Sequence, residues 1–282
     1  MTALFAALVD DAGLFPPEEL AMPDALARYR RDRATGHSVL TGRFLCPVAA
    51  VPTLVTNLAE GDHVRVGLIV PLSTRAVRDA VTAIEAEPAL ELASVEGVPA
   101  ATIVGGVAGS AEIADAVTAL RWVTVPRYVE VPTRAPAADL DLLAESGVGA
   151  KVRCGGQKAE LFPSAEDLAG FIVACVERGV PMKATAGLHH AVRYKDPVTG
   201  FTHHGFLNLV LAVCRAVAGG NATGVVDVLC SEDAGALATV AASVPANLGA
   251  EARAALVCYG SCSTSEPIED LENLGLLGTG VR

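Results

Sequence analysis

Two lysines, Lys151 and Lys183, each lie in the middle of a short apolar run that leads into glycine. The runs cover residues 148–156 and 180–190, and the segment between them has the pattern of one helix. Such a unit predicts two parallel neighbouring strands, which lie about 4.8 Å apart. Two close ammonium groups disfavour each other's charge and burial acts in the same direction, so we expect one lysine to be neutral. A neutral buried lysine attacks carbonyls, which indicates imine chemistry.

The elements that must hold these lysines follow a regular alternation. Apolar, β-branched runs alternate with alanine-rich amphipathic runs, which is the pattern of a parallel α/β fold. We expect strands at residues 4–10, 39–46, 64–70, 90–96, 122–131, 148–154 and 181–188. We expect helices at residues 74–87, 110–121, 136–146 and 164–178. Ser164 supplies a hydroxyl cap for the last of these helices, and Gly179 ends it.

Two segments, residues 223–230 and 254–260, compete for an eighth strand. The first also has helical spacing, so we favour the second. Either choice predicts a (β/α)8 TIM-like barrel of parallel strands. A doubly wound open sheet is the alternative, but no expected strand is followed by Gly-x-Gly-x-x-Gly or a Walker loop. We expect one barrel domain over residues 1–282, with residues 246–282 supplying the closing strand and a C-terminal helix.

The strand ends, where such barrels place their active sites, are polar in this chain. Alternation along each strand predicts that Lys151 shares a face with Arg153, and Lys183 with Thr185. Cations close to carboxylates suit an anionic carbonyl substrate, with Glu130 or Glu96 placed for proton transfer. A structural network of ion pairs that fills the barrel is the alternative. The predicted catalytic residues are Lys151, Lys183 and Glu130, and the predicted substrate-binding residues are Arg153, Thr185, His189, His190, Arg43 and Asp11.

The two lysine motifs resemble those of a known family. Lys-Val-Arg-Cys-Gly-Gly at residues 151–156 looks like the sixth-strand Lys-Thr-Ser-Thr-Gly motif of deoxyribose-phosphate aldolase, and Lys-Ala-Thr-Ala-Gly at 183–187 is similar to its seventh-strand motif. The resemblance implies a class I aldolase in which Lys151 forms the Schiff base and Lys183 tunes it. The family's Ile-Arg turn, which binds phosphate, is replaced here by Leu188-His189-His190, so phosphate recognition is not implied.

The expected function is therefore a cofactor-independent lyase of the aldolase type, which forms a lysine imine with a small anionic or hydroxylated carbonyl metabolite. A metal-assisted lyase, isomerase or hydrolase is the alternative, because His189-His190 and His203-His204 flank one loop and could hold a divalent metal together with carboxylates. Adjacent histidines on a strand face opposite sides, and neither His-x-His nor His-Glu-x-x-His occurs, so we expect no metal. A non-catalytic metabolite-binding barrel is the second alternative.

Composition limits the partners. The net charge of −11, from 32 acidic and 21 basic residues, disfavours nucleic acid and anionic membranes. No apolar stretch reaches the roughly 18 residues that a membrane span requires, and the N-terminus lacks the basic region of a signal peptide. The seven cysteines are scattered and form no Cys-x-x-Cys, as expected for reduced thiols. We expect a cytoplasmic protein with a small-molecule substrate; the sequence leaves the oligomeric state open, a homo-oligomer included.

Overall fold

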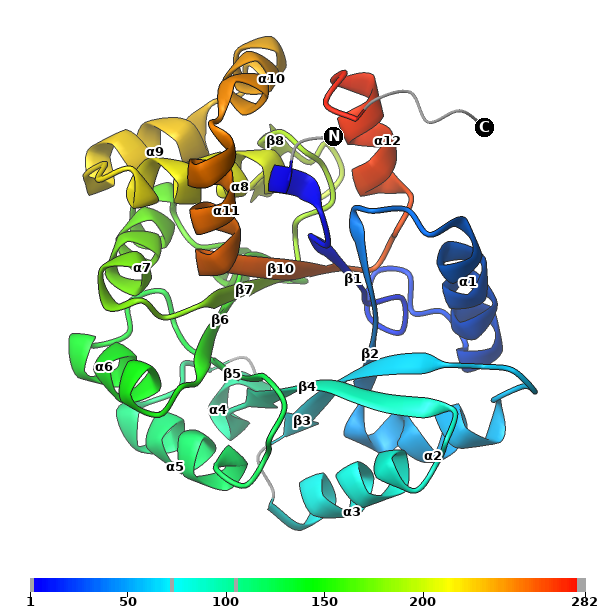
Figure 1. Ribbon diagram of the computed structural model, residues 1–282. Helices are drawn as coiled ribbons and strands as arrows, with labels where there is room; N and C mark the ends of the chain where they lie inside the picture. The colour runs from blue at the N-terminus through cyan, green and yellow to red at the C-terminus, as the bar shows by residue number, and fades with distance from the viewer. Residues whose placement is uncertain (1–2, 72–73, 104–105, 278–282) are drawn as a thin grey trace.

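The strands form a closed barrel in the computed structural model of this chain, which describes residues 3–71, 74–103 and 106–277. The order around the barrel is β1-β10-β7-β6-β5-β4-β3-β2, and every neighbouring pair is parallel (Figure 1). The predicted (β/α)8 barrel is confirmed. Residues 1–2 and 278–282 of the predicted domain lie outside the described part. The barrel strands are β1 (Val9–Asp11), β2 (Leu40–Pro47), β3 (Val64–Pro71), β4 (Leu90–Val98), β5 (Arg127–Glu130), β6 (Gly149–Arg153), β7 (Met182–Thr185) and β10 (Leu256–Ser261).

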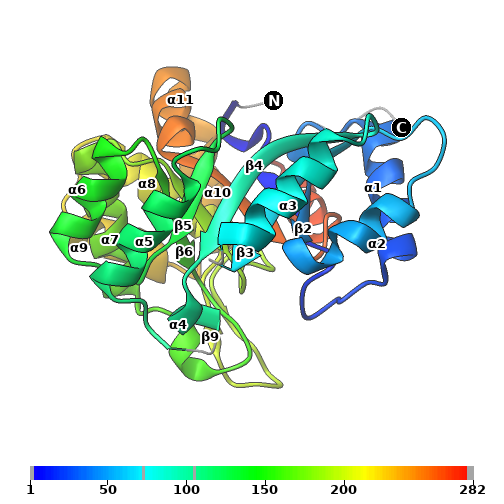
Figure 2. The same ribbon diagram turned by 90° about the horizontal axis from the view of Figure 1, so that it is seen from below.

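Helices surround the barrel on the outside (Figure 1). Longer and shorter helices both occur between the strands, and their bounds are α1 (Met22–Thr35), α2 (Val51–Thr56), α3 (Thr74–Glu85), α4 (Ala100–Ile103), α5 (Ser110–Leu120), α6 (Ala137–Glu145), α7 (Ala165–Arg178), α8 (Phe206–Val217), α9 (Ala222–Cys230), α10 (Ala234–Ser243), α11 (Ala246–Ala255) and α12 (Glu266–Asn273). A small antiparallel hairpin, β8 (Tyr194–Lys195) with β9 (Thr202–His203), follows β7. Figure 2 shows α4 and β9 extending beyond one end of the barrel.

The unit between the two lysines shows how local sequence determines these elements. The Ser164 side chain accepts a hydrogen bond from the Asp167 amide at the start of α7, and Gly179 ends the helix at a φ of 64°. Along β6, Ala150 and Val152 belong to the apolar core between sheet and helices, whereas Lys151, between them, faces the barrel interior. The helix therefore covers one face of β6 and leaves the other face for polar residues.

The structure decides between the two candidates for the eighth strand and shortens two other expected strands. Residues 223–230 form α9, and β10 takes the eighth place, as favoured. The expected strand at residues 4–10 begins with a 3-10 helix (Ala3–Phe5), and β1 starts only at Val9. In the expected strand at residues 122–131, only Arg127–Glu130 is a strand, because β5 pairs with β4 and β6 only over this short stretch.

The glycines that follow the two lysines let β6 and β7 end in close contact. A Cβ atom on Gly155 would lie 2.6 Å from the Gly187 Cα, and one on Gly187 would lie 2.7 Å from the carbonyl oxygen of Cys154. Gly187 also has a φ of +72°, where a side chain is strained. The glycines of both motifs are therefore explained by the packing of neighbouring strand ends.

No helix among the described residues is long and apolar enough to cross a membrane.

Candidate active site

Charged side chains of alternating sign form a continuous chain across the barrel interior. It runs through residues of β1, β2, β4, β5, β6 and β7 in the order Arg43, Asp10, Lys183, Glu96, Lys151, Glu130 and Arg153. Each interior carboxylate of the chain contacts two cations. Buried charges persist only where such pairing offsets the loss of water. Cations form both ends of the chain, so it contains one cation more than it has carboxylates.

Lys183 is the more enclosed of the two lysines. Its Nζ lies 2.6 Å from Asp10 Oδ2 and also contacts Glu96 Oε1, and its side chain is 1% exposed. Burial by itself lowers the pKa of Lys183. The carboxylates of Asp10 and Glu96 outweigh this effect and raise the pKa above its ordinary value. Lys183 is therefore not the neutral member of the pair, because two adjoining carboxylates that the sequence argument did not include hold it charged.

The carboxylates around Lys183 are ionised for the same reason. Burial raises the pKa of Asp10, but the Lys183 ammonium and the Arg43 guanidinium outweigh it and lower the pKa to about 2. Arg43 Nε lies 3.0 Å from Asp10 Oδ1, and the Thr41 hydroxyl donates to the same oxygen at 2.6 Å. Burial likewise raises the pKa of Glu96, but Lys183 and Lys151 outweigh it and lower the pKa below its ordinary value.

Lys151 differs from Lys183 in what lies above it. The two lysines are register partners on β6 and β7, and Lys151 is also the partner of Glu130 on β5. Lys151 Nζ lies 3.0 Å from Glu96 Oε2 and 3.6 Å from Glu130 Oε2. The two lysine side chains therefore converge, as the sequence predicted, but they meet at the two oxygens of one carboxylate, that of Glu96. Lys151 lines a pocket of about 660 Å³, whereas Lys183 does not line it.

This pocket opens at the carboxyl ends of the strands, where (β/α)8 barrels bind substrates. Arg153, Thr185 and His189 line it together with Lys151 and Glu130, as the sequence predicted. Arg153 Nε lies 2.9 Å from Glu130 Oε1, and its side chain is 34% exposed. His189 is half-buried, and burial lowers its pKa, as do the neighbouring His203 and His190.

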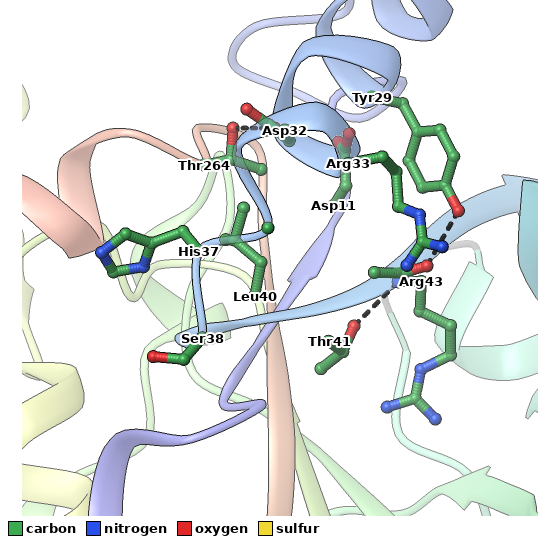
Figure 3. Close-up of a pocket in the computed structure, with 12 residues that line it drawn as sticks. Asp11, Tyr29, Asp32, Arg33, His37, Ser38, Leu40, Thr41, Arg43 and Thr264 are labelled. Carbon is green, nitrogen blue, oxygen red and sulfur yellow. Dashed lines mark hydrogen bonds between the residues drawn. The ribbon is translucent and has the colours of Figure 1, made fainter. Parts of the chain in front are cut away.

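The other predicted substrate-binding residues lie elsewhere. Arg43 faces the interior below the pocket, where it binds Asp10. Asp11 faces the opposite side of β1, because side chains alternate along a strand; it contacts Arg28 of α1 and accepts from the Gly13 amide at 2.9 Å. Both residues line a smaller pocket of about 160 Å³, in which Figure 3 shows their side chains pointing apart. His190 is exposed and lies 3.3 Å from Asp270.

The sequence prediction missed several residues that complete the site. Asp10 was passed over in favour of its neighbour Asp11, and Glu96 was considered only as a substitute for Glu130. Cys258 of β10 lies beside Asp10, with its Sγ 3.3 Å from Asp10 Oδ2. The Tyr128 ring lies 5.3 Å from Lys183 Nζ. Burial raises the pKa of Cys258 and of Tyr128 to about 12, so both stay protonated and act as neutral walls around Lys183.

The four paired histidines do not converge on one point. His203 Nδ1 lies 3.1 Å from the carbonyl oxygen of Gly187, and His204 Nε2 lies 2.8 Å from that of Pro163. These contacts hold the hairpin that follows β7 against the barrel end. Within residues 3–71, 74–103 and 106–277, no group of three or more His, Cys, Asp or Glu side chains is arranged to hold a metal ion.

Comparison with known proteins adds no family to this geometry, since no family model matches the chain and no curated protein matches it.

Proposed function

We propose that this protein is a cofactor-independent lyase of the class I aldolase type, in which Lys151 forms an imine with a small anionic or hydroxylated carbonyl compound. (β/α)8 barrels are commonly enzymes, with their sites at the carboxyl ends of the strands. The observation that carries the proposal is the position of Lys151. Its amine lies at the base of the 660 Å³ pocket and within 3.6 Å of two buried carboxylates.

Imine formation requires a neutral amine and a group that accepts its proton. Glu130 is placed for this, because its Oε2 lies 3.6 Å from Lys151 Nζ and Glu130 also lines the pocket. The freed lone pair of Nζ forms a bond to the carbonyl carbon, and the carbonyl oxygen takes up a proton. Loss of the second N–H proton, with departure of the oxygen as water, gives the imine. Amine plus carbonyl thus become imine plus water.

The imine then serves as an electron sink for carbon–carbon cleavage. Removal of a proton from a hydroxyl on the β carbon lets the bond between the α and β carbons break, and its electron pair moves toward the imine nitrogen. One carbonyl product leaves, and an enamine remains on Lys151. Protonation of the enamine at the α carbon and hydrolysis release the second product and restore the lysine. We assign these proton transfers to Glu130, because it is the carboxylate beside Lys151 that also lines the pocket.

Lys183 has a different role in this proposal. It is fully enclosed and does not line the pocket, and its raised pKa keeps it charged. Its ammonium binds one oxygen of Glu96 while Lys151 binds the other. Lys183 therefore adds a fixed positive charge beside Lys151 and shares the Glu96 carboxylate with it. This supports the division of roles that the aldolase resemblance implies.

Reductive trapping tests this proposal against a purely structural ion-pair network. The protein is incubated with a panel of aldehydes and oxo acids in the presence of cyanoborohydride, and its mass is measured. We expect a stable adduct on the wild-type protein and none on Lys151→Arg, which keeps a cation against Glu96 and Glu130 but forms no imine. Lys195→Arg is the matched control, because Lys195 is exposed on β8 and does not line the pocket. Equal trapping by wild type and Lys151→Arg would show that the network only fills the barrel.

A further inference from the structure

The pocket above Lys151 has two chemically different halves. The barrel order places β1, β2, β3 and β4 side by side on one half and β5, β6, β7 and β10 on the other. All charged side chains that line the pocket in the described part of the chain come from β5, β6 and the segments after β6 and β7. They are Glu130, Lys151, Arg153 and Lys158, together with His189, which is charged only when it is protonated.

The half formed by β1 to β4 is apolar. Among the described residues, these strands and the segments after them give the pocket no charged side chain, and Thr102 of α4 is the polar exception. The side chains that form this apolar wall are Phe15, Leu45, Pro47, Ile69, Pro71 and Val98. Phe15 and Ile69 are only half-buried, so part of their apolar surface is exposed toward the pocket. A ligand that covers such a surface removes it from water, which favours binding.

The opposite half contains a site for an anion next to the reactive amine. Only Nε of Arg153 is bonded within the described part of the chain, which leaves the two terminal nitrogens to a ligand. Lys158 is exposed on the same rim. Guanidinium nitrogens are suited to a carboxylate or phosphate group.

The spacing relates this anion site to the carbonyl. Arg153 follows Lys151 by two residues on β6 and faces the same side, and a strand rises about 3.3 Å per residue. The anionic group therefore lies about 6 to 7 Å from the lysine along the strand. An acid group one to a few bonds from the carbonyl carbon spans this gap, because the two long side chains lean toward the ligand from either end.

Resting on the proposed function, we infer that the carbonyl substrate is an anionic oxo compound with an aliphatic or aromatic body, rather than a polyhydroxylated sugar derivative. Its carbonyl reaches Lys151, its acid group contacts Arg153, and its apolar body covers the wall formed by Phe15, Leu45 and Ile69. A sugar would place hydroxyl groups against that wall without hydrogen-bond partners, which opposes binding.

Competition between matched carbonyl probes tests this inference. Pyruvate and ketoisocaproate have the same oxo acid group and differ only in the alkyl chain, whereas glyceraldehyde phosphate is hydroxylated and phosphorylated. We expect ketoisocaproate to be trapped by cyanoborohydride with an efficiency at least about tenfold above that of pyruvate. Ile69→Thr, which keeps a β-branched side chain, should lower this preference about threefold or more. Val198→Thr, a substitution on the exposed hairpin outside the pocket, should not change it.

The failures of the two proposals are distinguishable. If pyruvate or glyceraldehyde phosphate is trapped with the same efficiency as ketoisocaproate, the imine chemistry stands and the inferred substrate class is overturned. If no carbonyl is trapped, isocaproate, which lacks the ketone, reports on the pocket alone through its effect on the melting temperature. A stabilisation that Ile69→Thr and Arg153→Gln each reduce supports the inferred ligand chemistry without imine formation. The absence of stabilisation by isocaproate overturns it.

Discussion

At the scale of single residues, the shared carboxylate of Glu96 distinguishes the two lysines. Lys183 contacts Asp10 as well as Glu96, and both carboxylates are nearly inaccessible. Lys151 contacts Glu96 at 3.0 Å and Glu130 at a longer 3.6 Å, next to the pocket. The first arrangement fixes a charge, and the second leaves an amine that can meet a ligand. The residue that bears the strongest ion pairs is therefore not the one that we assign to bond formation.

Asp10 should be the carboxylate on which this arrangement depends most. Asp10→Asn removes a negative charge that contacts both Lys183 and Arg43, and leaves two buried cations with one partner fewer. We expect the free energy of unfolding to fall by about 3 to 5 kcal/mol, as measured by urea denaturation. Asp141→Asn is the matched control: it breaks an exposed ion pair with Arg178 and should cost about 1 kcal/mol or less.

The pH dependence of the stability difference between wild type and Asp10→Asn tests whether the ionised Asp10 carboxylate is its cause. The folded-state pKa of Asp10, about 2, lies below its ordinary 3.8. The ionised carboxylate therefore stabilises the fold at pH values above this ordinary pKa. This contribution, on the order of 2 kcal/mol, is lost as the pH falls from about 4 through about 2. The stability gap between wild type and Asp10→Asn should narrow over this window. A gap that stays constant would show that Asp10 is not held ionised by Lys183 and Arg43.

Alternation along strands predicted part of the site from the sequence alone. It placed Lys151 with Arg153 and Lys183 with Thr185 on shared faces, and the structure brings these faces together. It could not distinguish Asp10 from Asp11, because β1 is only three residues long and follows a 3-10 helix, which gives no pattern to fix the phase. Contacts between strands distant in the sequence, such as that of Cys258 with Asp10, had no local signal.

At the scale of elements, the glycines after β6 and β7 determine how closely the lysine strands end. Gly187→Ala would add a Cβ 2.7 Å from the Cys154 carbonyl oxygen at a φ of +72°. We expect it to lower the free energy of unfolding by about 3 kcal/mol or more, since backbone strain and overpacking add. Reductive trapping by the folded fraction should fall as well, because the end of β6, where Cys154 follows the strand that carries Lys151, must shift.

Gly179→Ala separates strain from collision. Gly179 ends α7 with a φ of +64°, and nothing lies within 4 Å of its added Cβ. We expect this substitution to cost about 1 kcal/mol and to leave trapping unchanged. Equal unfolding free energies for the two variants would show that the contact between Gly155 and Gly187 does not position the strand ends.

The element order was predictable because the helical and strand patterns alternate along the chain. The choice of β10 over residues 223–230 rested on the helical spacing of Val225, Val226, Val228 and Leu229, and the structure places all four in α9. The Asn221 side chain caps that helix by accepting from the Gly224 amide. The lengths of β1 and β5 were not predictable, because apolar residues continue past the pairing that limits each strand.

At the scale of the whole molecule, the charge of the interior opposes that of the chain. The protein carries a net charge of −11, yet the ion-pair chain inside the barrel has one cation more than it has carboxylates. The closed barrel brings cations of β2, β6 and β7 around carboxylates of β1, β4 and β5, which no short segment could do. An anionic ligand is therefore favoured at the pocket and disfavoured by the overall charge.

The location of the trapped carbonyl tests the central claim most directly. Wild-type protein is reduced with cyanoborohydride in the presence of ketoisocaproate, digested, and sequenced by mass spectrometry. The chain has lysines at positions 151, 158, 183 and 195, so the modified residue can be assigned without ambiguity. The account predicts a single adduct on Lys151. An adduct on Lys183, or one spread over Lys158 and Lys195 with Lys151 unmodified, would contradict it.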